Sequence, residues 1–539
     1  MSKILGIFGG SHNASASYVK DGEIICCIEE ERLKRIKSGN DFGRVPRLAC
    51  RTIMEKYQLK IDDFDHIAVC APFCNDFVKV LNPDPKKVTL INHHTCHCYG
   101  AYLTSGFSDK TLVVSYDGGG DRYFGKVYLA ENNKMTLIKS IPLWTAASAG
   151  QIYAHTTVNL GWQMLKDEGK VTGLAAHGKY NEIIYSQLNN IFFYNGDLSF
   201  SYADAPGKAS FVLTNLKKTK HLDYLDDPEK RDLKRPEIEY KADIAYNVQL
   251  LLEEEMKKFL NDLNSRYPEY KKLVLSGGLF ANVKLNQKIN ELPWVEEVYI
   301  SPPMGDDGLS LGAALTISYL NGERKTKRLD NVFLGLDYSN EEIEKSINFE
   351  YTKTPYSPEL LAEYLHQNKI AGWFQGKFEH GPRALGARSI LVKVTDPDTH
   401  QVLNERLGRH EIMPFAPFVL AEKADEIFHI NKSRMAAEFM TMCYDTKEGW
   451  AEKIPAVVHE ADGTARPQLV YEERNPKFHS ILKAYEKISG LPILLNTSFN
   501  GHGEPIIDSP SQALAHLESG MIDLLVAEDY IYFKNQNGI

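Results

Sequence analysis

The stretch Thr111–Leu129 has the sequence Thr-Leu-Val-Val-Ser-Tyr-Asp-Gly-Gly-Gly-Asp-Arg-Tyr-Phe-Gly-Lys-Val-Tyr-Leu. Its first six residues, Thr111–Tyr116, form a run typical of a buried strand. The glycine-rich run Asp117–Asp121 predicts a turn, and Phe124–Leu129 predicts the strand that follows it. The stretch therefore predicts two strands joined by a glycine turn, with an aspartate at the start of that turn.

A unit of the same architecture begins the chain. Ile4–Phe8 is an apolar run that stops at Gly9 and Gly10. Two further strands, Ala14–Val19 and Ile24–Ile28, are predicted to pair through the Asp-Gly turn between them. Two such units suggest duplicated nucleotide-binding lobes in an α/β fold, although the repeat is one of architecture and not of residues.

The bulk composition is that of a globular protein with several domains. The chain has 539 residues, 43% apolar and 25% charged, and at roughly 100–200 residues per domain we expect two to four domains. The net charge of −9 argues against broad, nonspecific binding to duplex nucleic acid, although it leaves room for a local basic groove.

Cysteine usage and apolar runs bear on the compartment. The eight cysteines follow no disulfide-rich framework. The apolar run at the N-terminus is too short for a signal peptide, and no stretch approaches the roughly 20 apolar residues that span a bilayer. We therefore expect a cytoplasmic protein without a membrane segment.

The second half of the chain is predicted to be a separate domain. Helical spacing over Ile244–Leu263 and Leu309–Leu320 belongs to the first part. The composition becomes basic and polar after residue 322, and no clear core element is predicted before Ser357, which opens a helix with an N-cap and a proline at N1. We therefore expect domains 1–340 and 355–539, the second with strands at Ile370–Gln375 and Pro492–Asn496.

A histidine cluster lies at Asn92–His97, which includes His93, His94 and His97. His93 and His97 are four residues apart, so on a helix they share one face and could bind one metal ion. The structural alternative is two helix histidines with ordinary hydrogen bonds. Cys96 and Cys98 are the neighbours of His97, about 100° around a helix from it, and we interpret both as packing residues.

Two carboxylates at glycine turns are candidate partners of these histidines. Asp117 lies in Tyr-Asp-Gly-Gly-Gly-Asp and Asp306 in Gly-Asp-Asp-Gly. Glycine lets backbone amides approach a phosphate while the aspartate reaches a cation, although an Asp-Gly turn on its own is usually only a turn. Two histidines with two aspartates would suit iron, manganese or zinc.

Two glycine loops are candidates for phosphate binding. Ser276–Asn282 follows a predicted strand and precedes a helix-like stretch, and bare amides at a helix start form an anion site. Gly9 and Gly10 could bind the other end of the phosphate chain. Each loop could equally be structural, but the two together favour a nucleotide cleft.

Two motifs in the second half are long and uncommon: Gly-Pro-Arg-Ala-Leu-Gly-x-Arg-Ser-Ile-Leu at residues 381–391 and Leu-Leu-Asn-Thr-Ser-Phe-Asn at 494–500. The matching segments, two of which contain these motifs, are Ile4–Lys37, Asn92–Phe107, Glu168–Gly178, Ser276–Asn286, Ser301–Leu315, Gly376–Leu391, His459–Val470 and Leu494–Pro505. Together these segments resemble the NodU/CmcH/TobZ carbamoyltransferase family over nearly the whole chain.

The resemblance implies an N-terminal two-lobed ASKHA domain similar to TsaD, followed by a YrdC-like α/β domain. In the family, the second domain converts carbamoyl phosphate and ATP into carbamoyl-adenylate. The first domain then transfers the carbamoyl group to an acceptor hydroxyl with the help of a metal.

The resemblance also implies site residues. The metal ligands would be His93, His97, Asp117 and Asp306. Carbamoyl phosphate and the adenylate phosphate would contact Arg383, Arg388, Arg466, Asn496 and Ser498. Nucleotide contacts would come from Gly9, Gly10, Lys170, Gly173, Gly277, Gly278 and Asn282. Arginine is suited to these anions because its guanidinium is permanently charged and binds oxygens in pairs.

One segment departs from the family pattern. Gly408, His410 and Met413 stand where relatives more commonly have basic residues. Arg406 and Arg409 could substitute from shifted positions, so the donor contacts of this segment stay open.

Several alternatives remain at this level. The acceptor is expected to be a sugar-like hydroxyl of a natural product, with a hydroxymethylated pyrimidine in a nucleotide or DNA as the alternative. Rival functions are a threonylcarbamoyl transferase acting on tRNA and a non-enzymatic ASKHA nucleotide-binding module. The resemblance suggests iron as the metal, with manganese, zinc or magnesium as alternatives; the oligomeric state is not determined, and a homodimer is one assembly considered.

Overall fold

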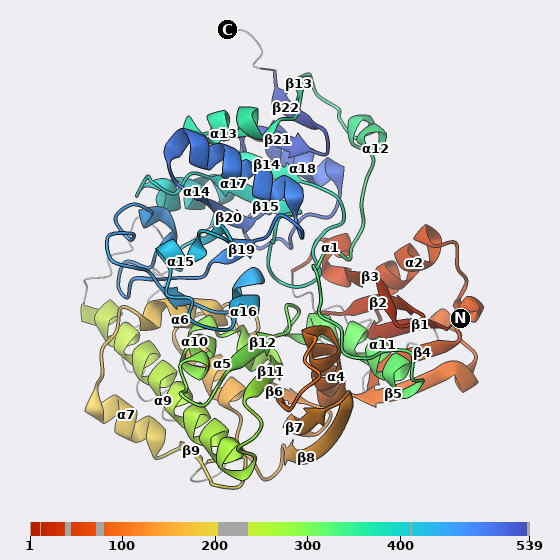
Figure 1. The fold of residues 1–539 in the computed structure, drawn as a ribbon, viewed down its shortest axis with the longest axis vertical. Coiled ribbons are helices and arrows are strands. Elements are labelled where there is room, and N and C mark those ends of the chain that lie inside the picture. The colour runs from red at the N-terminus through yellow and green to blue at the C-terminus, as the bar shows by residue number, and fades with distance from the viewer. Residues whose placement is uncertain are drawn as a thin grey trace.

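A computed structural model describes residues 2–10, 12–37, 45–71, 80–202, 236–409 and 412–535, with the backbone alone for 71 and 236–240. Most of its strands form two five-stranded sheets from the N-terminal part of the chain and one eight-stranded sheet from the C-terminal part (Figure 1), and two short pairs, β9 with β10 and β17 with β18, form separate two-stranded sheets. Helices pack around the three large sheets, and the protein is of the α/β class.

The first sheet has the order β3-β2-β1-β4-β5. Its strands are β1 (Lys3–Phe8), β2 (Ser15–Lys20), β3 (Glu23–Glu29), β4 (His66–Ala71) and β5 (Val88–Asn92). The first three strands are antiparallel, whereas β4 and β5 run parallel to β1. The predicted hairpin is confirmed: Asp21 and Gly22 connect β2 to β3, both with positive φ.

The second sheet repeats this topology in the order β12-β11-β6-β7-β8. Its strands are β6 (Thr111–Gly120), β7 (Tyr123–Glu131), β8 (Lys134–Pro142), β11 (Lys272–Ser276) and β12 (Glu297–Ile300). Again three antiparallel strands adjoin two parallel ones. The predicted turn at Asp117–Asp121 is too long, because β6 continues to Gly120 with a register irregularity, and the turn itself is Asp121 and Arg122.

Two helices pack against each other next to the two sheets. Helix α11 (Leu309–Leu320) contacts β1, β2 and β4, whereas α4 (His93–Ser105) contacts β6, β7 and β11. The helices cross closely, since a Cβ on Gly312 would lie 2.1 Å from the Cys96 carbonyl oxygen. This packing brings the start of α4 close to the loop that precedes α11. Cys96 and Cys98 are fully buried, which confirms their packing role.

The third sheet has the order β13-β22-β21-β14-β15-β20-β16-β19. Its strands are β13 (Tyr351–Pro355), β14 (Ala371–Phe374), β15 (Arg388–Val392), β16 (Ala416–Leu420), β19 (Gln468–Val470), β20 (Ile493–Ser498), β21 (Leu524–Ala527) and β22 (Tyr530–Lys534). The predicted cap is confirmed: Ser357 Oγ accepts from the Leu360 amide at 3.1 Å and begins α13 (Pro358–His366). Helix α17 (Pro476–Ser489) packs against α13.

The segment before Ser357 contains structure that the composition did not predict. Helix α12 (Asn340–Lys345) and strand β13 both precede that residue. A capping box joins Ser339 and Glu342 at the start of α12. The Ser-x-x-Glu pattern was its only sequence signal, because the helix is too short for apolar periodicity.

The remaining helices and short strands complete the fold. They are α1 (Glu30–Lys34), α2 (Arg47–Lys56), α5 (Ala149–Asn159), α6 (Glu168–Ala175), α7 (Glu182–Asn189), β9 (Phe192–Tyr194), β10 (Phe200–Tyr202), α9 (Pro236–Arg266), α10 (Val283–Asn290), α14 (Thr399–Leu407), α15 (Ala424–Ile427), α16 (Arg434–Glu438), β17 (Tyr444–Asp445), β18 (Thr464–Ala465) and α18 (Pro510–Glu518). Among the helices of the described ranges, none has the length and apolarity to cross a membrane.

Candidate functional site

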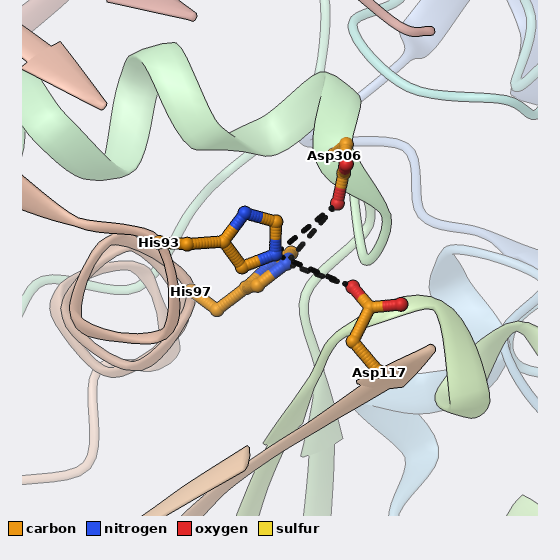
Figure 2. A group of neighbouring side chains, drawn as sticks. All are labelled: His93, His97, Asp117 and Asp306. Carbon is orange, nitrogen blue, oxygen red and sulfur yellow. Dashed lines mark ion pairs between the residues drawn. The ribbon is translucent and has the colours of Figure 1, made fainter. Parts of the chain in front are cut away.

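Four side chains from three elements converge near the start of α4 (Figure 2). His93 and His97 come from the first turns of α4, Asp117 from β6, and Asp306 from the short 3-10 turn before α11. The His97 Nε2 atom lies 3.3 Å from Asp117 Oδ2 and 3.5 Å from Asp306 Oδ1, and His93 Nε2 lies 3.5 Å from the same two oxygens. One ligand atom from each residue lies within 4.8 Å of all the others, as the predicted metal set requires.

Local backbone features position these four residues. Asn92 caps α4 by accepting from the Thr95 amide at 3.3 Å, so the helix begins at His93. The Asp121 carboxylate accepts from the His93 amide at 2.6 Å and ties the helix start to the β6–β7 turn. A Cβ on Gly120 would lie 2.4 Å from the His93 ring, so only glycine allows the strand to approach so closely.

A second layer of contacts orients the two imidazoles. Ser276 Oγ lies 3.1 Å from His97 Nδ1 and 3.4 Å from the Met304 carbonyl, to which it donates. The hydroxyl therefore accepts from Nδ1–H, which leaves the lone pair of His97 on Nε2 for a ligand. His94 differs, because its Nε2 contacts the Tyr123 carbonyl at 2.9 Å and its Nδ1 contacts Ser115, so its role is structural.

The buried donor atoms of the cluster fit a cation. Within the described residues, His93 Nε2, His97 Nε2 and Asp117 Oδ2 are buried and make no hydrogen bond, and the ion pairs of 3.3–3.5 Å that they form are with one another and with Asp306. Native proteins rarely leave buried polar atoms without a hydrogen bond. Two imidazole nitrogens and two carboxylates form a donor set suited to a divalent transition metal. The residues present therefore fit the metal that the sequence predicted.

The imidazoles and carboxylates of the cluster shift one another's pKa values. Burial alone would lower the pKa of His93, but the Asp306 and Asp117 carboxylates outweigh it and raise the pKa to about 10. Burial is likewise outweighed at His97, where Asp117 and Asp306 raise the pKa to about 9. Burial would raise the pKa of Asp117, yet its contacts with His93 and His97 hold it well below the usual range. Without a metal, protons on the imidazoles would balance the carboxylates.

A third histidine, His12, borders the cluster, and no role was predicted for it from the sequence. His12 Nε2 lies 3.7 Å from Asp306 Oδ2, while its Nδ1 pairs with the Asn13 side chain at 2.7 Å. The residue follows the Gly9-Gly10 loop and lies in the motif His-Asn-Ala-Ser-Ala-Ser. That motif was the only available signal, because no second histidine stands at ligand spacing from it.

The glycine loop at Ser276–Asn282 lies beside the cluster. Gly277 has φ +104°, and a Cβ there would lie 2.2 Å from the Tyr116 carbonyl oxygen. A Cβ on Gly278 would lie 3.1 Å from Asp117 Oδ1. Glycine at both positions thus lets the loop pack against the end of β6. Since His12 follows the Gly9-Gly10 loop, both glycine loops end near the four converging side chains.

Two other predicted nucleotide residues are held by protein contacts. Asn282 Oδ1 accepts from the Leu285 amide at 2.9 Å and caps α10, and its amide group donates to Gln249 at 2.8 Å. A Cβ on Gly173 would lie 2.6 Å from the Met413 sulfur, so Gly173 is a packing position between α6 and the C-terminal part.

A cavity of about 560 Å³ lies between the two halves of the chain. Four of the five predicted donor-site residues line it, together with Lys170 from α6: Arg383, Arg466, Asn496 and Ser498. The N-terminal half also contributes Lys37, Trp162, Lys166, Thr172, Ala281 and Val283. The structure therefore brings together residues that are more than 300 positions apart in the sequence.

Arg383 and Arg466 are two buried arginines that line the cavity. Within the described chain neither makes an ion pair, and both Nε atoms are buried without a hydrogen bond. Burial, followed by the positive charge of Arg466, lowers the pKa of Arg383 to about 9, and burial also lowers the pKa of Arg466. Two adjacent guanidinium groups of this kind form a site for an anion.

Arg388 lies elsewhere. Its guanidinium donates to the carbonyls of Gln375 at 2.9 Å and Gly376 at 3.0 Å, and it stacks on Phe374 at 3.6 Å from the ring centroid. The side chain is fully buried and does not line the cavity. The structure thus separates Arg388 from the other four predicted donor residues.

The segment that departs from the family pattern lies partly in the cavity. Arg409 lines it and donates to the carbonyls of Ser498 at 2.9 Å and Asn500 at 2.8 Å. Arg406 instead pairs with Asp523 outside the cavity. Gly408 is the left-handed C-cap of α14, Met413 lines the cavity, and His410 lies outside the described residues.

Comparisons with known proteins agree with these features. The family model described as Carbamoyltransferase N-terminus matches residues 69–315, and Carbamoyltransferase C-terminus matches 362–534. Nodulation protein NolNO of Sinorhizobium fredii is 30% identical over 562 residues, covering 97% of this chain and 79% of that protein. The uncharacterized protein MJ1051 of Methanocaldococcus jannaschii is 32% identical, covering 98% of this chain and 99% of that one.

Solved structures are more distant. Component A of (R)-2-hydroxyglutaryl-CoA dehydratase from Acidaminococcus fermentans has a TM-score of 0.36 at 18% identity, covering 59% of this chain and 97% of that one. This similarity is too weak to define the fold. The matched family models and the extent of identity with NolNO carry the assignment, and the chain belongs to the carbamoyltransferase family.

Proposed function

We propose that this carbamoyltransferase is an ATP-dependent O-carbamoyltransferase that uses carbamoyl phosphate. The observation that carries the proposal is the pair Arg383 and Arg466, which line a cavity between the two halves and form no ion pair within the described residues. Donor activation would occur there, and transfer to the acceptor would occur at the cluster of His93 and Asp117. An ASKHA-type N-terminal domain (1–340) is supported by the repeated sheet topology, and a YrdC-like C-terminal domain (355–539) by the family resemblance.

The activation step would proceed by loss of phosphate and then of pyrophosphate. Water releases inorganic phosphate from carbamoyl phosphate, the carbamate oxygen attacks the α-phosphorus of ATP, and pyrophosphate leaves. Arg383 and Arg466 would bind the phosphate oxygens through charged, paired hydrogen bonds and stabilise the negative charge of the transition state. Ser498 and Asn496, which line the same cavity, would orient the planar carbamoyl group.

The transfer step would break the bond between the carbamoyl carbon and the adenylate oxygen. The acceptor hydroxyl would attack that carbon and AMP would leave, and His12, whose Nε2 lies 3.7 Å from Asp306 Oδ2, would take the hydroxyl proton. His93, His97, Asp117 and Asp306 would hold the metal, for which the resemblance favours iron. The metal would polarise the carbamoyl carbonyl or the phosphate as a Lewis acid.

The acceptor is proposed to be a sugar-like hydroxyl of a natural product, with a hydroxymethylated pyrimidine as the alternative. Membership in the carbamoyltransferase family removes the non-enzymatic module from consideration. The tRNA threonylcarbamoyl alternative would use the same two types of fold but a different donor and a tRNA acceptor. It would need a basic face for RNA, which the net charge of −9 does not indicate.

The test is a pair of assays on the purified full-length chain. Pyrophosphate release from ATP is measured with carbamoyl phosphate and, separately, with threonine plus bicarbonate. Release with carbamoyl phosphate alone supports the proposal, and release only with threonine and bicarbonate contradicts it. Radiolabelled carbamoyl phosphate is then offered with sugars, nucleosides and hydroxymethylated DNA to identify the acceptor.

A further inference from the structure

A loop of the C-terminal part makes buried contacts with the first sheet. Residues 375–387 connect β14 to β15, and His380 in this loop contacts Glu29, the last residue of β3, at 2.7 Å between Nδ1 and Oε1. The Gly381 amide donates to the same oxygen at 2.7 Å. Arg32 completes the contact, since its Nη2 donates to the Gly381 carbonyl at 2.8 Å and its Nε lies 3.2 Å from Glu29 Oε2. We call Glu29, Arg32 and His380 the clasp.

The three side chains of the clasp are buried, so breaking their contacts would leave charges without partners away from water. Glu29 is 3% exposed, Arg32 2% and His380 2%. Charges removed from water to this degree are tolerated only when each is paired and hydrogen-bonded. Burial alone would raise the pKa of Glu29, but Arg32 and then His380 outweigh it and lower the pKa to about 2. The carboxylate therefore stays charged and keeps both partners in place.

The loop itself is braced from within. Glu379 Oε1 accepts from the amides of Leu385 at 2.8 Å, Ala387 at 2.7 Å and Arg388 at 3.0 Å. These three bonds close the loop on its own backbone. Contacts at His380 and Gly381 therefore help to fix the position of Arg383, which stands two residues after Gly381 in this constrained loop and lines the cavity.

The other side of the clasp reaches the metal ligands. A Cβ on Gly381 would lie 3.3 Å from the Pro302 carbonyl, so the loop lies against the segment that leads to Asp306. His380 also shares a small cavity of about 10 Å³ with His97 and with Ser276, the partner of His97. The clasp therefore lies next to the loop that carries Arg383 and next to residues that adjoin the metal ligands.

We propose that Glu29 and His380 are positioning residues that hold the Arg383 loop against the metal-binding half, so that the activated carbamoyl group passes between the two sites without loss to water. This inference rests on the proposed function. If the clasp is weakened, water would attack the carbamoyl carbon, the bond to the adenylate oxygen would break, and carbamate and AMP would be released with no acceptor consumed.

The test needs no acceptor. The full-length wild type and the variant Glu29→Gln are each loaded with metal and supplied with carbamoyl phosphate and α-labelled ATP. The steady rate of AMP release is compared with the rate of exchange between pyrophosphate and ATP. We expect Glu29→Gln to keep the exchange rate within about 2-fold while AMP release rises about 5-fold or more, the lower end of typical coupling between sites.

Matched variants separate positioning from structure. His380→Asn places an amide where Nδ1 stands and retains a donor to Glu29, so its rate of AMP release should equal that of the wild type. His380→Ala removes the donor, so its rate of AMP release should rise. Lys432→Met removes another contact across the same interface, in which Lys432 Nζ donates to the Leu292 carbonyl at 3.1 Å. It should leave AMP release unchanged. Should Glu29→Gln fail to fold, the comparison of His380→Asn with His380→Ala decides the question.

Each outcome has one interpretation. Equal rates of AMP release in the wild type, Glu29→Gln and His380→Ala overturn the positioning role. A rise in AMP release in Lys432→Met as large as that in Glu29→Gln also overturns it. Loss of exchange in a folded Glu29→Gln protein also overturns it, because Glu29 would then act in donor activation. Failure of the proposed function would appear earlier and separately, as a wild type with no exchange that depends on carbamoyl phosphate.

Discussion

At the scale of single residues, the proposed division into two half-reactions rests on two groups of side chains that differ in charge. The four-residue cluster gathers two imidazoles against two carboxylates, whereas the arginines Arg383 and Arg466 line the cavity without an ion pair in the described chain. The first set suits a cation and the second suits anions. Each set can therefore be removed by substitution without touching the other.

Alanine at His93 should abolish carbamoyl transfer and leave carbamoyl-adenylate formation intact, because only the transfer site loses a ligand. Asp306→Ala should behave in the same way. The measurements are pyrophosphate exchange and transfer of radiolabel to an acceptor. If the His93 variant loses exchange as completely as transfer, the division of labour is wrong.

Alanine at Arg383 should abolish both reactions, since no adenylate would form to be transferred. The matched control is Arg406→Ala, an arginine of the same half that pairs with Asp523 outside the cavity. It should keep exchange within about 2-fold of the wild type, as expected for a surface ion pair. Equal loss in both variants would contradict the role of the cavity.

Ser276→Ala should weaken metal binding without removing a ligand. The hydroxyl fixes the His97 ring through Nδ1, and loss of such an outer contact typically lowers metal affinity about 10–100-fold. Metal titration followed by metal analysis of the desalted protein gives the affinity directly. Unchanged affinity would mean that packing alone orients His97.

At the scale of elements, the close crossing of α4 and α11 determines the geometry of the cluster. The two helices bring His93 and His97 next to the turn that carries Asp306. Gly312 makes this approach possible, because a side chain there would meet the backbone of Cys96.

Gly312→Ala should therefore destabilise the protein by about 1–3 kcal/mol, the usual cost of overpacking a tight contact. Gly169→Ala is the control, since a Cβ at that helical position meets nothing within 4 Å. It should be neutral or stabilise by roughly 0.5–1 kcal/mol. Urea denaturation measures both, and equal stability of the two variants would show that the helices can move apart freely.

At the scale of the whole molecule, the bound metal should stabilise the fold. The four ligands come from segments around residues 93, 117 and 306, so a cation that binds them links distant parts of the chain. At a free metal concentration of about 100 times the dissociation constant, binding adds about 2.7 kcal/mol. The unfolding temperature of the wild type should rise on metal addition, and that of Asp306→Asn should not.

The sequence by itself determined the local features. Alternation of apolar residues and turn signals predicted β1 to β3, the strand β14 and the helix α11, because these depend on neighbours a few residues apart. The His-x-x-x-His spacing determined that two imidazoles share a helix face. Resemblance of long motifs supplied the family, which the comparisons then confirmed.

Only the tertiary structure decided which distant residues meet. Composition could not distinguish Arg383, whose side chain faces the cavity, from Arg388, whose donors are bound to carbonyls of its own loop, since the two stand five residues apart in one motif. Composition also could not show that Arg409 lines the cavity and Arg406 does not. It could not predict that His12 lies beside Asp306 or that Glu29 lies beside His380. These meetings depend on how the sheets and helices pack, which joins side chains hundreds of residues apart and leaves no periodic signal in the chain.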